Sequence, residues 1–409
     1  MPAMQSKQWC RNDSFTMVVF SFALFSSTAF ADAQDGLSDE VVTLNQLATD
    51  ISQPTAIKAP QGNIGQYRTP DSRNDGLLTA DMHGMGIDTQ RINQLRQDIT
   101  AGNYGQIDSL LIHHKGKLVS EDYWHDGGID KPHFMFSITK NMLSNAIGKA
   151  IELGYIDSVN DPAIKYLSNI DRKQLAAGSE FITLHDLLSM QSGISISNNH
   201  AAHQASITVD NHAALYLTLS DNVVPGQRFK YQGADTDILN HVLFNTTGKD
   251  LAAFTEEYFF TPMAIDNAYW EESACGLTKA SSGLHMTSRD MLKFGMLVLG
   301  EGQFNGKPLL TKGWLDTATT PKTRNGNYGY FWWTQNFRLN GKEINTISAR
   351  GARGQFIFVN PELDLIVAVT SSNTGQQRRV PLQFVPEYIL PAIPPAKESR
   401  DDDKYFSTG

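Results

Sequence analysis

A serine and a lysine lie three residues apart in the segment Phe136-Ser137-Ile138-Thr139-Lys140, directly before a stretch with helical periodicity. At that spacing on a helix the two side chains share one face, so the amine of Lys140 can reach the hydroxyl of Ser137. A serine hydroxyl is a weak nucleophile until a neighbouring base removes its proton, and the positive end of a helix favours the alkoxide that forms. The pair predicts a nucleophile and its base, but the spacing is common by chance and needs support from other elements.

The stretch after Ser137 has the pattern of a buried helix. Apolar residues recur at three- and four-residue spacing from Met142 to Ile151, and Gly154 stands where a C-terminal cap belongs. Further helices are predicted at 87–99, 184–190, 238–244, 251–259 and 291–299, and strands at 107–112, 117–123, 328–335, 343–347, 355–359 and 363–371.

The order of these elements predicts the fold class. Because strands lie at both ends of the sequence with helices between them, we predict an α+β fold. It would have an antiparallel sheet built from both chain ends and flanked by helices, plus an all-helical lobe at about 155–320. The Ser137 site is expected where the sheet and the lobe meet.

Several stretches follow one another in a characteristic order: the strand pair, the Phe136–Lys140 segment with its helix, and Leu187-Leu188-Ser189-Met190-Gln191-Ser192-Gly193. In this order they resemble the serine beta-lactamase and penicillin-binding superfamily, and more narrowly its class C-like branch of esterases, peptidases and 6-aminohexanoate-dimer hydrolases. The resemblance runs from about Ile107 to Ser372 and includes Tyr328-Gly329-Tyr330-Phe331-Trp332-Trp333. It implies a beta-lactamase/transpeptidase-like fold and a serine hydrolase of the carboxylesterase or amidohydrolase type, working through an acyl-enzyme on Ser137.

The second element of that family has two counterparts here. Ser220-Asp221-Asn222 copies the Ser-Asp-Asn motif of class A beta-lactamases. Tyr231 instead follows a Pro-Gly and a short extended segment and precedes a helix, which is similar to the class C-like branch, and we favour it. Gly233 stands where many relatives have an asparagine, and Asp235 is the nearby side chain that could substitute. The missing amide argues against beta-lactam turnover more than against acyl transfer.

The third element in relatives is Lys-Thr-Gly, His-x-Gly or similar, on an edge strand. Ala349-Arg350-Gly351 is the best counterpart, because small residues let a strand approach a substrate closely. Lys322-Thr323-Arg324 is closer in letters but lacks the glycine. The resemblance places the oxyanion donors at the backbone N–H groups of Ser137 and Ala352. Arg350, and less so Arg353, could hold a substrate carboxylate or be a surface charge.

The expected scheme is acyl transfer. Ser137 attacks an ester or amide carbonyl, Lys140 and Tyr231 share the roles of general base and general acid, and water releases the acyl group. We expect the positive charge of Lys140 to lower the pKa of Tyr231.

Three functions stay open. We favour hydrolysis of an ester or a linear amide. The second is a beta-lactamase or D-Ala peptidase acting on cell-wall material. The third is a protein that holds a cell-wall ligand without turnover, against which the intact set of Ser137, Lys140 and Tyr231 argues.

The histidines and cysteines predict no metal site. His113, His114, His200, His203 and His212 lack a helical His-Glu-x-x-His core, so we interpret them as surface histidines and expect neither a metal nor a cofactor. Cys10 precedes an apolar run near the N-terminus, and the remaining cysteine, Cys275, is interpreted as structural filler.

The ends of the chain predict its location. Lys7 and Arg11, an apolar run at 15–25 and Ala29-Phe30-Ala31 match a secretory signal peptide at 1–31. We therefore predict a periplasmic or secreted protein without a stable membrane span. The rest divides into an N-terminal arm at 32–85, a beta-lactamase-like serine hydrolase domain at 86–395 and a polar tail at 396–409.

The net charge of the chain restricts the classes of binding partner that we expect. The formal net charge is -9, and no run of lysines and arginines would follow a phosphate backbone, which argues against nucleic acid. A small-molecule ester or amide is the expected partner, and the oligomeric state is left open.

Overall fold

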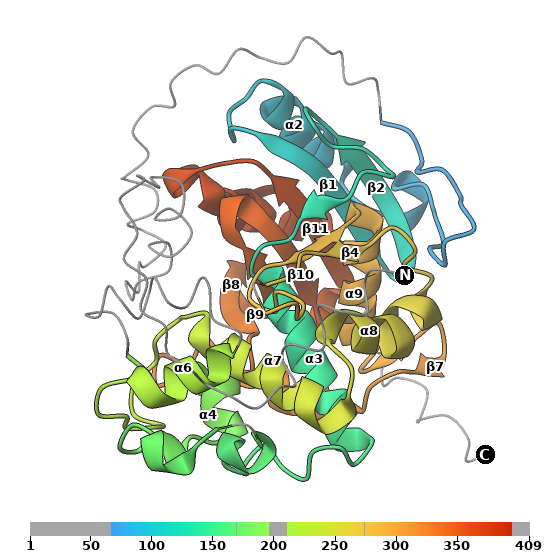
Figure 1. The fold of residues 1–409 in the computed structure, drawn as a ribbon. Helices are drawn as coiled ribbons and strands as arrows, with labels where there is room; N and C mark the ends of the chain where they lie inside the picture. Colours follow the sequence, from blue (N-terminus) through green and yellow to red (C-terminus); the bar gives the residue numbers. More distant parts are fainter. Residues whose placement is uncertain (1–66, 169, 196–210, 274, 395–409) are drawn as a thin grey trace, which may run out of the picture.

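The computed structural model describes residues 67–168, 170–195, 211–273 and 275–394 (Figure 1). The predicted signal peptide, the start of the N-terminal arm, His200, His203 and the polar tail lie outside these residues. A sheet with its covering helices forms one part of the described chain, and a mainly helical lobe forms the other.

One six-stranded sheet joins the two ends of the described chain. Its order is β2-β1-β11-β10-β9-β8, and every neighbouring pair is antiparallel. Because β1 pairs with β11, the predicted antiparallel sheet built from both chain ends is confirmed. The strands are β1 (Ile107–His114), β2 (Lys117–Tyr123), β8 (Trp333–Leu339), β9 (Lys342–Gly351), β10 (Gln355–Asn360) and β11 (Leu365–Ser371).

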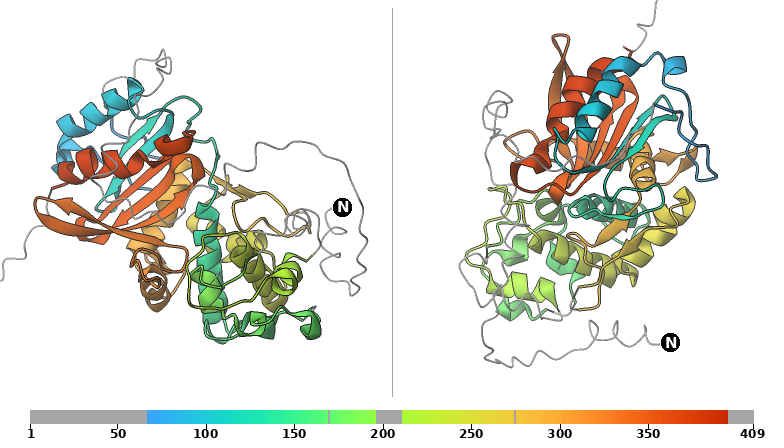
Figure 2. Two further views of the ribbon diagram at one scale, coloured as in Figure 1. Left: turned by 90° about the vertical axis from the view of Figure 1, so that its left-hand side faces the viewer. Right: turned by 90° about the horizontal axis from the view of Figure 1, so that it is seen from above.

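Helices cover both faces of the sheet. As a result, β1, β10 and β11 are buried at every position. The helix α9 (Ser288–Leu299), capped by Thr287, contacts these same three strands from the side of the lobe. The opposite face is covered by α2 and the C-terminal helices, which lie together in Figure 2. Their bounds are α2 (Thr89–Thr100), α11 (Pro381–Phe384), η12 (Val385–Ile389) and α12 (Leu390–Ala392).

The long helix α3 (Ile138–Glu152) connects the sheet to the helical lobe. It contacts α7, α8 and α10 of the lobe as well as β9 of the sheet. Its Gly148 allows this packing, because a Cβ there would lie 2.4 Å from the indole of Trp314. The other helices of the lobe are α4 (Leu184–Leu188), α6 (His212–Leu219), α7 (Ala234–Thr247), α8 (Leu251–Thr255) and α10 (Lys312–Thr319).

The lobe differs from the prediction in two respects. It includes short strands, and α9 falls within the predicted 155–320 range although it packs on the large sheet. The helix predicted at 251–259 changes to a π-helix, η7 (Glu256–Phe260), after α8. The short strands are β3 (His133–Phe134), β4 (Tyr269–Trp270) and β5 (Leu284–Met286) in one sheet, and β6 (Gln303–Phe304) and β7 (Lys307–Pro308) in another.

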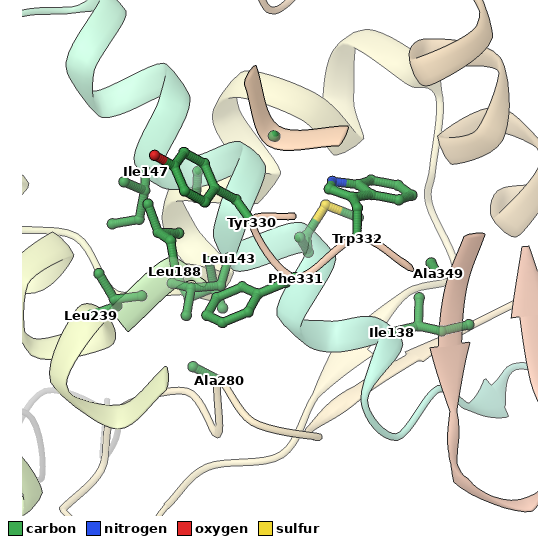
Figure 3. Close-up of a cluster of buried hydrophobic side chains, with 14 of the residues drawn as sticks. Ile138, Leu143, Ile147, Leu188, Leu239, Ala280, Tyr330, Phe331, Trp332 and Ala349 are labelled. Atoms are coloured by element: carbon green, nitrogen blue, oxygen red, sulfur yellow. The ribbon is translucent and has the colours of Figure 1, made fainter. Parts of the chain in front are cut away.

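The aromatic segment at 328–333 is mostly a buried loop, and the prediction of an alternating strand there is wrong. The strand β8 begins only at Trp333, and the preceding Phe331 has a positive φ of 64°. Its carbonyl accepts a hydrogen bond of 2.8 Å from Asn141 of α3. Figure 3 shows Tyr330, Phe331 and Trp332 among apolar side chains of α3 and α4. The five aromatic residues of this segment are all buried, which agrees with the expectation that at least half of them belong to the core.

The described end of the N-terminal arm packs on the body. Thr79 forms a bridge to Leu118 of β2, and the Tyr67 hydroxyl donates to the carbonyl of Val119 at 3.0 Å. Leu77 and Met82 are buried. Residues 67–85 are therefore held against the sheet through backbone pairing and apolar contacts.

Candidate active site

A strained turn presents Ser137 at the start of α3. The strand β3, directly before the turn, pairs with β5, and the backbone N–H of Met135 donates to the carbonyl of Leu284 at 2.9 Å. Phe136, directly before the serine, has a positive φ of 47°, an uncommon conformation for a bulky residue. Thr139 secures the turn, because its hydroxyl donates to the Phe136 carbonyl at 2.6 Å. The hydroxyl of Ser137 makes no capping bond and is left for other contacts.

Lys140 lies one turn further along α3 and points at Ser137. Its Nζ is 2.9 Å from Ser137 Oγ and donates to the carbonyl of Ser281 at 2.6 Å. The residue is only 5% exposed, and among the described residues no carboxylate lies within ion-pair distance of Nζ. Burial lowers the pKa of Lys140 to about 7, and the charge of Asp237 opposes this shift in part. A large fraction of Lys140 is therefore neutral near pH 7.

Tyr231 reaches the same two residues from the loop before α7. Its hydroxyl is hydrogen-bonded to that of Ser137, and the Nζ of Lys140 lies 5.1 Å from the centre of its ring. The ring packs against Tyr328 and Trp333, with ring centres 6.1 and 6.0 Å away. The structure thus brings Ser137, Lys140 and Tyr231 together, as the sequence predicted.

The predicted direction of the Tyr231 pKa is wrong. Burial raises the pKa of Tyr231 to about 12, although the hydrogen bond with Ser137 and the charge of Arg350 both act to lower it. The desolvation of the phenolate exceeds the effect of nearby positive charge. Tyr231 is therefore a neutral phenol at neutral pH, and Lys140 is the group that can lose its proton.

The alternative motif Ser220-Asp221-Asn222 forms the end of a helix. The Ser220 hydroxyl donates to the carbonyl of Tyr216 at 2.6 Å, within its own helix α6. The backbone N–H of Asp221 donates to the carbonyl of Ser195 at 3.4 Å. The motif therefore serves the loop after α6, while Tyr231 occupies the position next to Ser137.

Side chains around Gly233 point away from Ser137. The Gln232 amide donates to Ser192 at 3.2 Å and to Asp235 at 2.9 Å, and the Ser192 hydroxyl also donates to Asp235, at 2.6 Å. Asp235 is fully buried, and this burial raises its pKa to about 7. Asp235 thus holds the Ser192 loop to the start of α7, and the substitute role considered for it at the missing asparagine is not supported by these contacts.

The segment Ala349-Arg350-Gly351 ends the strand β9, beside the turn that carries Ser137. β9 is not the edge strand of the sheet, but its pairing with β8 stops at Ser348, so the last residues have β10 alone as neighbour. A Cβ on Gly351 would lie 2.3 Å from the Met135 carbonyl oxygen. Only glycine allows this approach, which places Ala352 and its backbone N–H directly after the contact.

The two arginines of this segment differ in their surroundings. Arg350 donates to Ser348 at 2.9 Å and to Gln335, and its guanidinium lies 5.0 Å from the ring centre of Trp333. Burial lowers the pKa of Arg350 to about 9. Arg353 is exposed, with its guanidinium 5.8 Å from the ring centre of Phe136. Arg353 is therefore the more accessible of the two cations, whereas the sequence favoured Arg350 for contact with a substrate carboxylate.

Two contributors to the site gave no signal in the sequence. Ser281 acts through its backbone carbonyl, for which no side-chain pattern exists, and Asp237 acts on Lys140 across the packing of α3 and α7. The prediction of surface histidines is also wrong where it can be compared. His113, His114 and His212 are all buried, and so is Cys275.

Within the described ranges, none of the helices has the length and apolar character needed to cross a bilayer.

Comparisons with known proteins agree with the fold. The beta-lactamase family model matches residues 107–384. The chain is 22% identical over 295 residues to the 6-aminohexanoate-dimer hydrolase of Paenarthrobacter ureafaciens, covering 65% of this chain and 72% of that one.

Two solved structures share the architecture at low sequence identity. A D-stereospecific amidohydrolase from Streptomyces sp. superposes with a TM-score of 0.54 at 16% identity, over 68% of this chain and 94% of that chain. A class C beta-lactamase mutant superposes with a TM-score of 0.58 at 13% identity, over 73% of this chain and 96% of that chain. Because the family model matches more than half of its length, this chain belongs to the beta-lactamase family.

Proposed function

We propose that this protein is a serine hydrolase that cleaves an ester or a linear amide through an acyl-enzyme on Ser137. The observation that carries the proposal is the buried amine of Lys140, 2.9 Å from the Ser137 hydroxyl and without a carboxylate partner in the described chain. Its pKa of about 7 makes it a usable base near neutral pH. A purely structural lysine has no need of this arrangement.

The first half of the reaction transfers the acyl group to the enzyme. Neutral Lys140 accepts the proton of Ser137 as Oγ attacks the carbonyl carbon of the substrate. The Ser281 carbonyl accepts one N–H of the amine and so helps to aim its lone pair at the serine. The oxyanion would lie between the backbone N–H groups of Ser137 and Ala352, and the close approach of Gly351 to the Met135 carbonyl supports this placement.

The second role belongs to Tyr231 as a proton donor. Its raised pKa keeps the phenol protonated, so it can pass a proton to the leaving alcohol or amine and regain one from Lys140. Collapse of the tetrahedral intermediate leaves the acyl group on Ser137. Water then attacks the ester carbonyl with Lys140 again as base, which frees the acid and restores the serine.

The surroundings favour an ester or a linear amide over a beta-lactam. No side-chain amide of the Tyr231 motif points at Ser137 in the described structure, because Gln232 is held by Ser192 and Asp235. The exposed guanidinium of Arg353 beside Phe136 would attract a substrate that carries a carboxylate. The 6-aminohexanoate-dimer hydrolase similar to this chain bears the name of an enzyme acting on a linear amide.

A comparison of two serines on α3 tests the proposal. Ser137→Ala should reduce kcat/KM on a chromogenic short-chain ester by about 10⁴-fold or more. Ser144→Ala is the matched control, because Ser144 is a buried serine on the same helix whose hydroxyl has no partner within the described structure. Ser144→Ala should keep activity near wild type, and full activity of Ser137→Ala would refute the scheme.

A substrate panel and mass spectrometry test the reaction class. Rapid mixing with an ester should give an adduct with the mass of the acyl group on the peptide that contains Ser137. Steady turnover of esters or linear amides without cephalosporin hydrolysis supports the proposal. Rapid cephalosporin hydrolysis would indicate a beta-lactamase, and a burst that stops after one equivalent would indicate a binding protein.

We further propose export of the protein, on the strength of the signal-like sequence at 1–31. N-terminal sequencing of the mature protein should begin at Asp32.

A further inference from the structure

Three buried side chains of types that can bind metal ions come together in the helical lobe. One ligand atom each of His212, His241 and Cys275 lies within 4.8 Å of the other two. They are 8%, 6% and 4% exposed. The three residues come from α6, from α7 and from the loop between β4 and β5, so their meeting depends on the tertiary fold.

The second observation concerns His241. Its Nε2 is buried and, within the described ranges, has no hydrogen-bond partner. A buried ring nitrogen that lacks a partner is costly in a folded protein, and a bound ion is one way to satisfy it. The imidazole rings of His212 and His241 lie with their centres 6.5 Å apart at an angle of 82°, so they do not stack face to face.

A carboxyl group lies beside these three side chains. Asp237 lies one turn before His241 on the same face of α7, and its carboxylate interacts electrostatically with His212, His241 and Cys275. The hydroxyl of Tyr216, one turn after His212 on α6, donates to Asp237 at 3.4 Å. A thiolate and a carboxylate together would balance the two charges of a divalent cation.

We propose that His212, His241 and Cys275 form a binding site for a thiophilic divalent metal ion of the Zn²⁺ class. Two imidazoles and one thiolate are the donors that Zn²⁺ prefers, and the fourth position would be taken by Asp237 or a water. Zn–N and Zn–S bonds of about 2.1 and 2.3 Å require donor atoms roughly 3.5 Å apart, so the cluster would contract on binding. The thiol of Cys275 would release its proton to solvent.

The position of the site gives it a structural consequence. The helix α7 begins three residues after Tyr231, and the loop that carries Cys275 continues to Ser281, whose carbonyl binds Lys140. Asn240 of α7 already holds this loop through a 2.8 Å hydrogen bond to the carbonyl of Thr278. The metal would add a second tie between α6, α7 and the loop that supports Lys140.

The probe for the site is Co²⁺, which takes the place of Zn²⁺ and reports on its ligands. The full-length protein, freed of metal with a chelator under reducing conditions, should bind one equivalent of Co²⁺ with a thiolate-to-cobalt charge-transfer band. Added Zn²⁺ should displace the cobalt and abolish the band. Zn²⁺ should also raise the thermal unfolding temperature, because it binds the folded state.

Three variants locate the ion. Cys275→Ser, a change of one atom, should abolish the charge-transfer band and weaken Zn²⁺ binding by more than about 100-fold, since loss of even an outer-shell partner costs about 10- to 100-fold. His241→Gln should weaken Zn²⁺ binding to a similar degree. His113→Gln is the control, because His113 is a buried histidine on β1, remote in sequence from the cluster, whose ring nitrogens have no partner in the described structure.

The outcomes are decisive and independent of hydrolysis. Retention of the cobalt band in His113→Gln and its loss in the other two variants would support the site. The proposal fails if the wild-type protein shows no saturable binding of Co²⁺ or Zn²⁺. It also fails if Cys275→Ser or His241→Gln, shown to be folded by circular dichroism, binds Zn²⁺ as tightly as wild type.

Discussion

Two buried cations of this protein, one on α9 and one on α3, have opposite surroundings. Arg289 of α9 is 3% exposed and is bound by Glu121 at 2.6 and 2.7 Å and by Asp75 at 2.7 Å. Lys140 of α3 is 5% exposed and contacts a hydroxyl and a backbone carbonyl, both of them neutral. Each group has lost its water, but only the arginine has gained opposite charges.

The difference appears in the protonation of the two groups. Burial acts against the charge of Arg289, but its hydrogen bonds to Glu121 and Asp75 raise its pKa above the usual range overall. Burial without such partners lowers the pKa of Lys140 to about 7. Arg289, whose charge is neutralised, holds the arm at Asp75 to the sheet at Glu121. Lys140 has no such carboxylate partners and can lose its proton near neutral pH. On the proposed function, the same desolvation serves stability at Arg289 and chemistry at Lys140.

The largest effect is expected from Lys140→Met, which keeps an unbranched apolar stem of similar length and removes the amine. On the proposed function kcat/KM should fall by about 10³- to 10⁴-fold, the upper range for loss of a general base. The free energy of unfolding should stay level or rise, because a buried group that lacks an ionic partner is replaced by an apolar one. Ester kinetics and urea denaturation measure the two quantities.

Lys293→Met is the matched control for this variant. Lys293 is equally buried, on α9, but it forms an ion pair of 3.0 Å with Asp290. Its replacement should reduce the stability and leave kcat/KM near wild type. The opposite result is that Lys140→Met lowers the stability as Lys293→Met does and keeps its activity. That result would contradict the assignment of Lys140 as a base and of Lys293 as a structural cation.

Arg289→Met should show the opposite pattern. The substitution leaves Glu121 and Asp75 without their cation, and breaking a buried pair in this way costs about 3–5 kcal/mol of stability. The kcat of the folded fraction should stay near wild type, because Arg289 has no contact with Ser137 or Lys140 in the described structure. The double variant Arg289→Met/Glu121→Leu should recover part of the lost stability. A loss of kcat without a loss of stability would contradict the structural role.

A smaller effect is expected at Tyr231. Tyr231→Phe keeps the packing against Trp333 and Tyr328 but removes the proton donor, so kcat should fall by about 10²-fold. The pH at which activity falls on the acid side should stay unchanged, since that limb belongs to Lys140. A shift of this limb in Tyr231→Phe would show that the two residues titrate as one unit.

The sequence predicted the local parts of this site well. Ser137 and Lys140 are three residues apart on one helix, so their proximity follows from helix geometry alone. The order of the strands sufficed to predict the fold class. The Tyr231 motif sufficed to predict the third side chain of the site. These features depend on patterns within one element or on the order of elements.

Other features depended on packing that no local pattern encodes. The pKa of Tyr231 was predicted in the wrong direction, because the extent of its burial follows from contacts with Tyr328 and Trp333 far along the chain. The segment at 328–333 was predicted as a strand because its aromatic residues have high strand propensity, which tertiary contacts with α3 and α4 override. The cluster of His212, His241 and Cys275 likewise spans three elements without a recognisable spacing.

Taken per pH unit, the smallest effect is a dependence of stability on pH that Lys140, and not Arg289, should produce. Folding lowers the pKa of Lys140 from about 10.4 to about 7, so between these pH values the unfolded chain holds a proton that the folded chain lacks. The cost of burying the charge is complete below pH 7 and disappears as the pH rises. This group should therefore increase the free energy of unfolding by about 1.4 kcal/mol per pH unit in that window. Urea denaturation of wild type and Lys140→Met across this range isolates the slope, because all other groups are shared. Two parallel curves would show that Lys140 keeps its proton in the folded protein, and the distinction between the two cations would then rest on geometry alone.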